Sequence, residues 1–146
     1  MRELPRQLSV DELAELFEGR TRFVERLAKV EDPLGRAREL ARALSDEEKK
    51  EVLDAHPAIG ARTGLSKRSA AEQGADEDPK VLAELAELNR RYEEKFGFRF
   101  VVFVNRRPKS EIVPILRERL ERTREQELET AVDELVQIAV DRWQRS

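Results

Sequence analysis

The sequence of 146 residues contains no cysteine, one histidine and one tryptophan. The absence of cysteine excludes disulfides, thiolate catalysis and cysteine-ligated zinc sites. A single histidine argues against a transition-metal centre, because such centres usually need several nitrogen or sulfur ligands. No apolar run approaches the roughly 20 residues of a membrane span, and the N-terminal stretch MRELPRQLSVDE lacks the apolar core of a signal peptide. We therefore expect a cytoplasmic protein without a metal centre.

No large excess of one charge is present either. Charged residues make up 40% of the chain and hydrophobic residues 39%, and the net charge is only −3. Acidic and basic residues are interspersed along the chain, which argues against a nucleic-acid or membrane partner. The basic pieces Ser66–Arg68 and Asn105–Arg107 are short and lack interleaved aromatic residues, so we interpret them as solvated loops. The length indicates one domain, over residues 1–146.

Hydrophobic residues recur at helical spacing along most of the chain, which predicts an all-α fold, a compact bundle of about seven or eight short helices. Helix starts are marked by Ser or Thr followed three residues later by Glu or Gln, the capping-box pattern. Such pairs are Ser9 with Glu12, Ser45 with Glu48, and Thr123 with Gln126. Asp78-Pro79 predicts another helix start, and Gly97 predicts the end of that helix.

The segment Phe98–Val104 has the β-branched and aromatic composition of a buried strand. No second segment offers itself as a pairing partner, and a lone strand is not stable. We therefore expect an extended or partly helical piece lodged in the helical core. Its almost entirely apolar side chains would suit the wall of a pocket.

The only histidine, His56, precedes Pro57 at the end of a predicted helix. Proline disfavours the α conformation in the preceding residue, so the helix should end at about Ala55. Partial negative charge at a helix C-terminus favours a protonated imidazole, which suits a proton donor. The alternative is structural, because a lone histidine before proline is more often a cap or a packed ring.

Two other features allow both a structural and a functional interpretation. Ser69 and Glu72 form a capping box, but a helix N-terminus can also present N–H groups to an anionic ligand. Arg142, near the C-terminus, is either a solvated helix-end residue or a guanidinium that pairs with a substrate carboxylate or carbonyl.

Taken together, these features resemble the 2-oxo-4-hydroxy-4-carboxy-5-ureidoimidazoline (OHCU) decarboxylases of urate breakdown. The matching motifs cover nearly the whole chain in the same order. They are His56-Pro57-Ala58-Ile59-Gly60, Ser69-x-x-Glu72-Gln73, Asn89-x-x-Tyr92-x-x-x-Phe96-Gly97-Phe98-x-Phe100-Val101, and a late helix with Glu125, Glu127-Leu128, Ile138 and Arg142. One departure is Arg122, where family members often carry asparagine.

The resemblance implies a helical homodimer that decarboxylates OHCU to S-allantoin and needs no cofactor. It implies that His56 is the catalytic proton donor. The substrate-binding residues it implies are Pro57, Ser69, Glu72, Gln73, Phe100, Val101, Val102, Phe103, Val104 and Arg142. Glu72 would either hold the ureido N–H groups of the substrate or orient His56.

Two alternatives belong to other functional classes. A related purine-catabolic enzyme of the same fold would keep the pocket but act on another ureido substrate. A non-catalytic helical interaction module would tolerate loss of His56 and would have no closed pocket beside it.

Overall fold

The structure is a computed structural model, and it describes residues 2–59 and 78–145. Within these ranges the chain forms seven helices and no strand, which confirms the predicted all-α fold. The helices are α1 (Val10–Phe17), α2 (Arg22–Leu27), α3 (Pro33–Arg42), α4 (Asp46–Asp54), α6 (Pro79–Phe96), α7 (Lys109–Leu120) and α8 (Arg124–Arg145). Helices α6 and α8 are the longest of these, with 18 and 22 residues.

Most helix ends lie where the local sequence predicts them. Both serine capping boxes form, at Ser9 before α1 and at Ser45 before α4. Asp78 caps α6 through the N–H of Lys80, and Gly97 ends that helix in the left-handed conformation with a φ of 82°. Local hydrogen bonds of side chains therefore decide these boundaries.

Two helix ends lack the usual local signal. Helix α7 begins at Lys109, and its N-cap Pro108 makes no side-chain capping hydrogen bond. Helix α1 ends at Phe17, and Glu18, although a glycine follows it, is the residue in the left-handed conformation, at a φ of 66°. A side chain is uncommon in that conformation, so tertiary contacts of Glu18 must support it.

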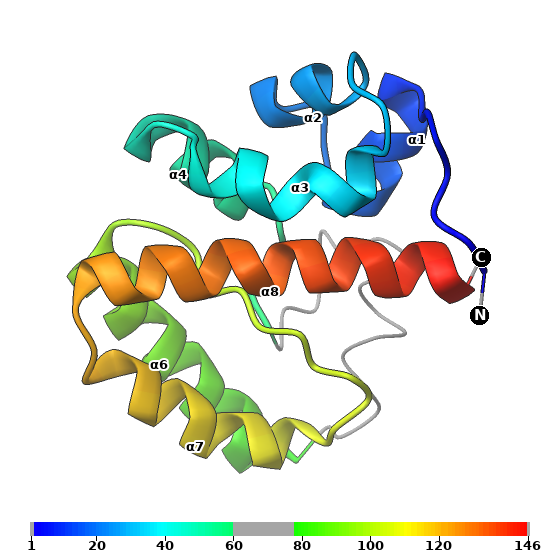
Figure 1. Cartoon of the computed structure of the whole chain (residues 1–146). Helices are drawn as coiled ribbons and strands as arrows, with labels where there is room; N and C mark the ends of the chain where they lie inside the picture. Colours follow the sequence, from blue (N-terminus) through cyan, green and yellow to red (C-terminus); the bar gives the residue numbers. More distant parts are fainter. Residues whose placement is uncertain (1, 60–77, 146) are drawn as a thin grey trace.

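Helix α8 runs through the middle of the molecule, with α1 to α4 on one side and the pair α6 and α7 on the other (Figure 1). Residue contacts link α8 to α1, α3 and α4, and link α6 to α7. The central position of α8 is explained by its buried apolar side chains, which include Ala131, Val132, Leu135 and Ala139. Burial of this apolar stripe between two layers is the main force that assembles the bundle.

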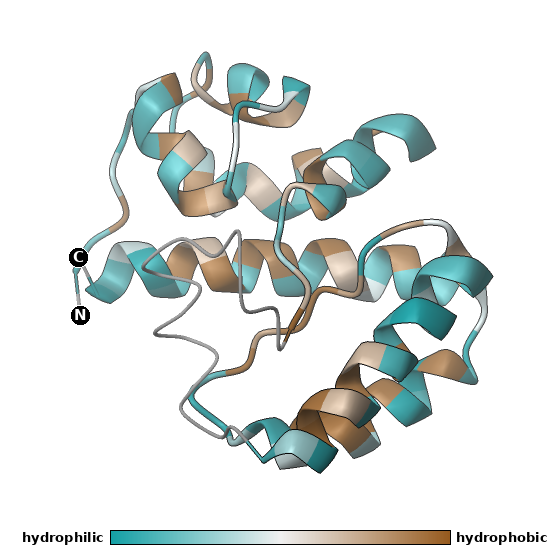
Figure 2. Ribbon diagram, turned by 180° about the vertical axis from the view of Figure 1, so that it is seen from behind, coloured by the Kyte–Doolittle hydropathy of each residue, from teal (hydrophilic) through white to brown (hydrophobic). Residues whose placement is uncertain are grey.

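The segment Phe98–Val104 is extended and pairs with no strand, as predicted. It runs beside α8 as a hydrophobic stretch of irregular chain (Figure 2). Side chains from the neighbouring helices hydrogen-bond to its backbone: Asp54 of α4 accepts from the N–H of Arg99 at 2.9 Å, and Arg119 of α7 donates to the carbonyl oxygen of Val101 at 2.8 Å. These bonds replace the ladder that a strand would have, because buried backbone polar groups need partners.

Candidate active site

His56 lies one residue beyond the C-cap of α4. The helix ends at Asp54, Ala55 is its C-cap, and the N–H of His56 still donates to the carbonyl oxygen of Leu53 at 3.1 Å. This position confirms that Pro57 ends the helix where the sequence predicts. The imidazole is 5% exposed, so it is buried rather than solvated.

Two side chains hold the segment that carries His56. Arg99 Nη1 donates to the carbonyl oxygen of His56 at 2.5 Å, and Asn89 Nδ2 donates to the carbonyl oxygen of Ile59 at 3.1 Å. Asn89 projects from α6 and Arg99 from the extended segment that follows it. The turn from His56 to Ile59 is therefore anchored at both ends by the far side of the bundle.

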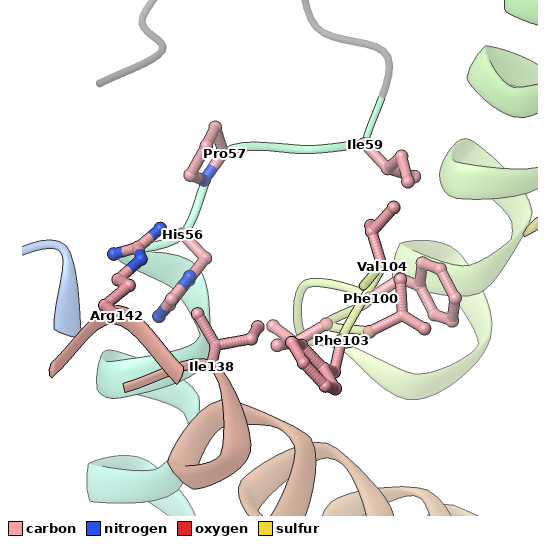
Figure 3. A pocket seen from close by; sticks show the side chains of 10 residues that line it. His56, Pro57, Ile59, Phe100, Phe103, Val104, Ile138 and Arg142 are labelled. Atoms are coloured by element: carbon pink, nitrogen blue, oxygen red, sulfur yellow. The ribbon is translucent and has the colours of Figure 1, made fainter. Parts of the chain in front are cut away.

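His56 faces a pocket that is partly open to solvent (Figure 3). The predicted site residues within the described ranges meet there, although they lie up to 86 positions from one another in the chain. The lining residues are His56, Pro57, Ile59, Phe100, Val101, Val102, Phe103, Val104, Ile138 and Arg142. The other predicted site residues, Ser69, Glu72 and Gln73, lie outside the described residues, as does the helix expected from Ser69.

Ile59 and Ile138 line the pocket but were not predicted as site residues. Both belong to motifs that carry the family resemblance. A helical signal also exists for Ile138, because residues four apart on a helix share a face, and Ile138 is four residues before Arg142. Ile59 has no comparable local signal, since its place in the wall depends on the fold of the turn.

Burial lowers the pKa of His56 from 6.5 to about 4. Loss of solvation is the main cause, and the positive charge of Arg142 acts in the same direction, as does Arg99 to a smaller degree. The carboxylate of Glu18 opposes them by raising the pKa. The expectation that the helix end favours a protonated imidazole is therefore wrong for the unliganded site, because desolvation outweighs the helix dipole.

This lowered pKa predicts a pH-dependent stability. The unfolded chain binds the histidine proton more tightly than the folded chain, so the free energy of unfolding should fall as the pH decreases from 6.5 toward about 4. Between about pH 7.5 and pH 5 the loss from this group should be about 2 kcal/mol. Urea unfolding at both pH values measures it, with His56→Gln as the control that lacks this titration. Equal losses in both proteins would contradict the buried, neutral imidazole.

Arg142 is 2% exposed, so its interpretation as a solvated helix-end residue is wrong. Its Nη1 donates to the carbonyl oxygens of Glu15 at 3.3 Å and Leu16 at 3.1 Å, at the C-terminal end of α1. Its Nη2 pairs with Glu18 Oε1 at 2.9 Å. The guanidinium thus joins the two ends of the chain, and it also lines the pocket beside His56 (Figure 3).

A buried charge network supports the apolar wall. Glu127 is fully buried and accepts hydrogen bonds from Tyr92 Oη at 2.6 Å and Arg119 Nε at 2.7 Å. The same arginine holds the Val101 carbonyl, and its guanidinium carbon lies 4.6 Å from the ring centre of Phe100. Arg122, at the position where family members often carry asparagine, adds a bond to Glu127 Oε2 at 3.1 Å. The network therefore fixes two residues of the pocket wall from behind.

Within residues 2–59 and 78–145, no group of three or more His, Asp or Glu side chains could hold a metal ion. Nor does any helix within residues 2–59 and 78–145 combine the length and apolar character needed to cross a membrane. That the site needs no cofactor stays a prediction.

The amino-acid sequence is similar to those of known OHCU decarboxylases and uric acid degradation proteins. The family model described as OHCU decarboxylase matches residues 2–144. The chain is 32% identical over 141 residues to 2-oxo-4-hydroxy-4-carboxy-5-ureidoimidazoline decarboxylase of Haloferax volcanii, covering 89% of this chain and 83% of that protein. It is 34% identical over 110 residues to the uric acid degradation bifunctional protein of Bacillus sp. strain TB-90, where the match covers 73% of this chain and only 22% of the longer relative.

Solved structures agree with the sequence comparison. The fold matches the crystal structure of an OHCU decarboxylase determined in the presence of (S)-allantoin, with a TM-score of 0.73 and 26% identity. The match covers 90% of this chain and 94% of the other. With the sequence matched almost from end to end and the fold shared, this chain belongs to the OHCU decarboxylase family.

Proposed function

We propose that the chain decarboxylates OHCU to S-allantoin, with His56 as the proton donor. The observation that carries this proposal is the state of the imidazole. His56 Nε2 is buried and has no hydrogen-bond partner among the described residues. A buried polar nitrogen without a partner is costly, and such groups are typical of functional sites. It lies beside Arg142 and an apolar wall, in a pocket that combines apolar side chains with a few polar groups, as ligand sites usually do.

The chemistry requires one proton and no redox step. When the carbon–carboxylate bond breaks, carbon dioxide leaves and the electron pair stays on the ring carbon. The adjacent carbonyl or C=N group of the substrate can delocalise this pair, so the substrate supplies its own electron sink. A proton from His56 then forms the new C–H bond and leaves the imidazole neutral. Delivery to one face of the ring would give the S product.

The neutral resting state of His56 agrees with this role if the substrate itself promotes protonation. An anion close to an imidazole favours the charged form, so a bound carboxylate should raise the pKa of His56 from its value of about 4. The donor would then take up its proton when substrate binds. Protonation in the empty pocket would instead leave a buried charge beside the guanidinium of Arg142.

The apolar wall would strengthen these charge interactions. Phe100, Val101 and Val104 are at most 6% exposed and offer no polar side-chain atoms. Exclusion of water lowers the local dielectric, which makes the attraction between Arg142 and a substrate carbonyl or carboxylate stronger.

The family resemblance adds three residues that lie outside the described ranges. Gln73, with nearby backbone N–H groups, would hydrogen-bond the developing oxyanion, an interaction typically worth about 3 kcal/mol for each donor. Ser69 would contact the substrate, and Glu72 would bind the ureido group or orient His56. These assignments rest on the motif alone.

A coupled assay followed by circular dichroism tests the proposed function. Urate oxidase and hydroxyisourate hydrolase would generate OHCU from urate, and this protein would be added in catalytic amounts. Rapid appearance of the S-allantoin signal, above the slow racemic background, is expected. If folded protein leaves the background unchanged, the proposal is wrong, and other ureido carboxylates become the substrates to screen.

The resemblance also implies a homodimer and a cytoplasmic location. Both stay predictions for this chain. Size-exclusion chromatography with light scattering would test the first, with a mass of twice 16.9 kDa expected.

A further inference from the structure

Glu18 is a half-buried acid that the proposed reaction does not yet use. It follows the last residue of α1 and adopts a φ of 66°, a conformation that few residues with side chains take up. The backbone turn there is closed by the N–H of Gly19, which donates to the carbonyl oxygen of Ala14 at 2.9 Å. Strained residues of this kind persist where the surrounding structure requires their position, and they cluster at functional sites.

The ion pair with Arg142 requires Glu18 to keep this position. Glu18 Oε1 lies 2.9 Å from Arg142 Nη2, and the two side chains are 12% and 2% exposed. A guanidinium so deeply buried is costly unless its charge is compensated. Among the described residues, the end of α1 supplies further compensation, because the carbonyl oxygens of Glu15 and Leu16 accept from Nη1. Negative partial charge at this helix end adds to the carboxylate.

The charges of Glu18 and Arg142 also affect the protonation of the His56 imidazole. The charged groups that affect His56 come from three elements: Arg142 of α8, Glu18 at the end of α1, and Arg99 after α6. At the end of its own helix α4, Asp54 binds the backbone N–H of Arg99. Among the described residues, Arg142 and Arg99 therefore oppose protonation of His56, and Glu18 favours it. A proton donor between two guanidinium groups needs such a counter-charge.

We propose that Glu18 is a positioning residue of the decarboxylase, which holds the Arg142 guanidinium at the pocket and balances its charge beside His56. This inference rests on the proposed function for its catalytic meaning. Its structural part, the electrostatic coupling of Glu18 to His56, can be tested without turnover.

The test compares Glu18→Gln with Glu25→Gln. Glutamine keeps the size of the side chain and can still accept from Arg142, but it removes the charge. Glu25 is exposed on the neighbouring helix α2, so its variant removes the same charge at the surface. In the Glu18 variant kcat at neutral pH should fall by about tenfold, because an opposite charge nearby typically shifts a protonation equilibrium by at least that factor. The Glu25 variant should behave as wild type.

The pH profile separates an electrostatic role from a merely structural one. A proton donor is lost as the pH rises through its pKa in the substrate complex, so the alkaline limb of kcat should move to lower pH in the Glu18 variant. KM should change little if Arg142 keeps its position. A lower kcat with an unmoved alkaline limb would overturn the proposal and leave Glu18 a structural residue.

Nuclear magnetic resonance gives the readout that needs no activity. His56 is the only histidine, so its ring resonances require no assignment by mutation. Its pKa should be lower in Glu18→Gln than in wild type, and equal pKa values would contradict the coupling. If wild type shows the coupling but does not consume OHCU, only the proposed function fails. Should Glu18→Gln fold poorly, Glu18→Gly suits the positive φ and must shift both measurements in the same direction.

Discussion

His56→Gln is expected to lower kcat for OHCU by about 10²–10⁴-fold, the usual contribution of general acid catalysis. Glutamine is polar and of similar size, but it cannot supply a proton near neutral pH. The fold should survive, because His56 Nε2 has no hydrogen-bond partner among the described residues that its loss would break. Neutral glutamine also avoids placing a charge beside Arg142. The coupled dichroism assay measures the rate of S-allantoin formation in both proteins.

A suitable control for this variant is Ala58→Ser. Ala58 lies two residues after His56 in the same turn, but it does not line the pocket. Its variant should keep nearly wild-type turnover. A loss of kcat that occurs only in His56→Gln would then not result from disturbance of the turn. Far-ultraviolet dichroism and urea unfolding of both variants establish that they are folded. Wild-type turnover in folded His56→Gln would rule out the proton-donor assignment.

Glu127→Ala is expected to produce the largest loss of stability, about 3–5 kcal/mol, as removal of one partner from a buried ion pair usually does. Glu127 is 0% exposed and accepts from Tyr92, Arg119 and Arg122. Without it, the guanidinium of Arg119, which is 5% exposed, would be a buried charge lacking its carboxylate partner. Urea unfolding at neutral pH gives the difference in the free energy of unfolding.

The matched control lies two residues further along α8. The side chain of Glu129 is 63% exposed and pairs with Arg42 at 3.3 Å, and exposed pairs of this kind contribute about 0–1 kcal/mol. Glu129→Ala should therefore unfold almost as wild type does. Similar losses in the two variants would mean that the buried network contributes no more than a surface pair.

Loss of this network should also affect the pocket. Arg119 holds the Val101 carbonyl at 2.8 Å, so a displaced guanidinium frees part of the apolar wall. The wall is thus linked to α8 through Arg119 and Glu127. Removal of Glu127 should therefore lower the free energy of unfolding and also change the shape of the pocket.

Much of the fold follows from short-range signals. The capping boxes at Ser9 and Ser45, the proline after His56 and the glycine after Phe96 place helix ends within a residue or two. Each signal works locally, since a side chain within three or four residues satisfies or removes a backbone hydrogen bond. The absence of strand pairing in Phe98–Val104 was predictable for another reason, because no second segment could pair with it.

The left-handed conformation of Glu18 was not predictable in this way. Local preference favours Gly19 for that position. The glutamate adopts it because its carboxylate meets Arg142, 124 residues later in the chain. No local pattern contains a partner at that distance. The same separation explains why Arg142 could be interpreted as a solvated helix end.

The sequence by itself determined the helical class, most helix boundaries, the single imidazole and, through its motifs, the family and most of the described pocket residues. Only the tertiary structure decided the charge state of that imidazole. Helix position alone favours a proton on His56, whereas burial beside Arg142 lowers its pKa to about 4. The physical reason is that helix caps are local hydrogen bonds, while solvation and charge at a buried group depend on every element packed around it.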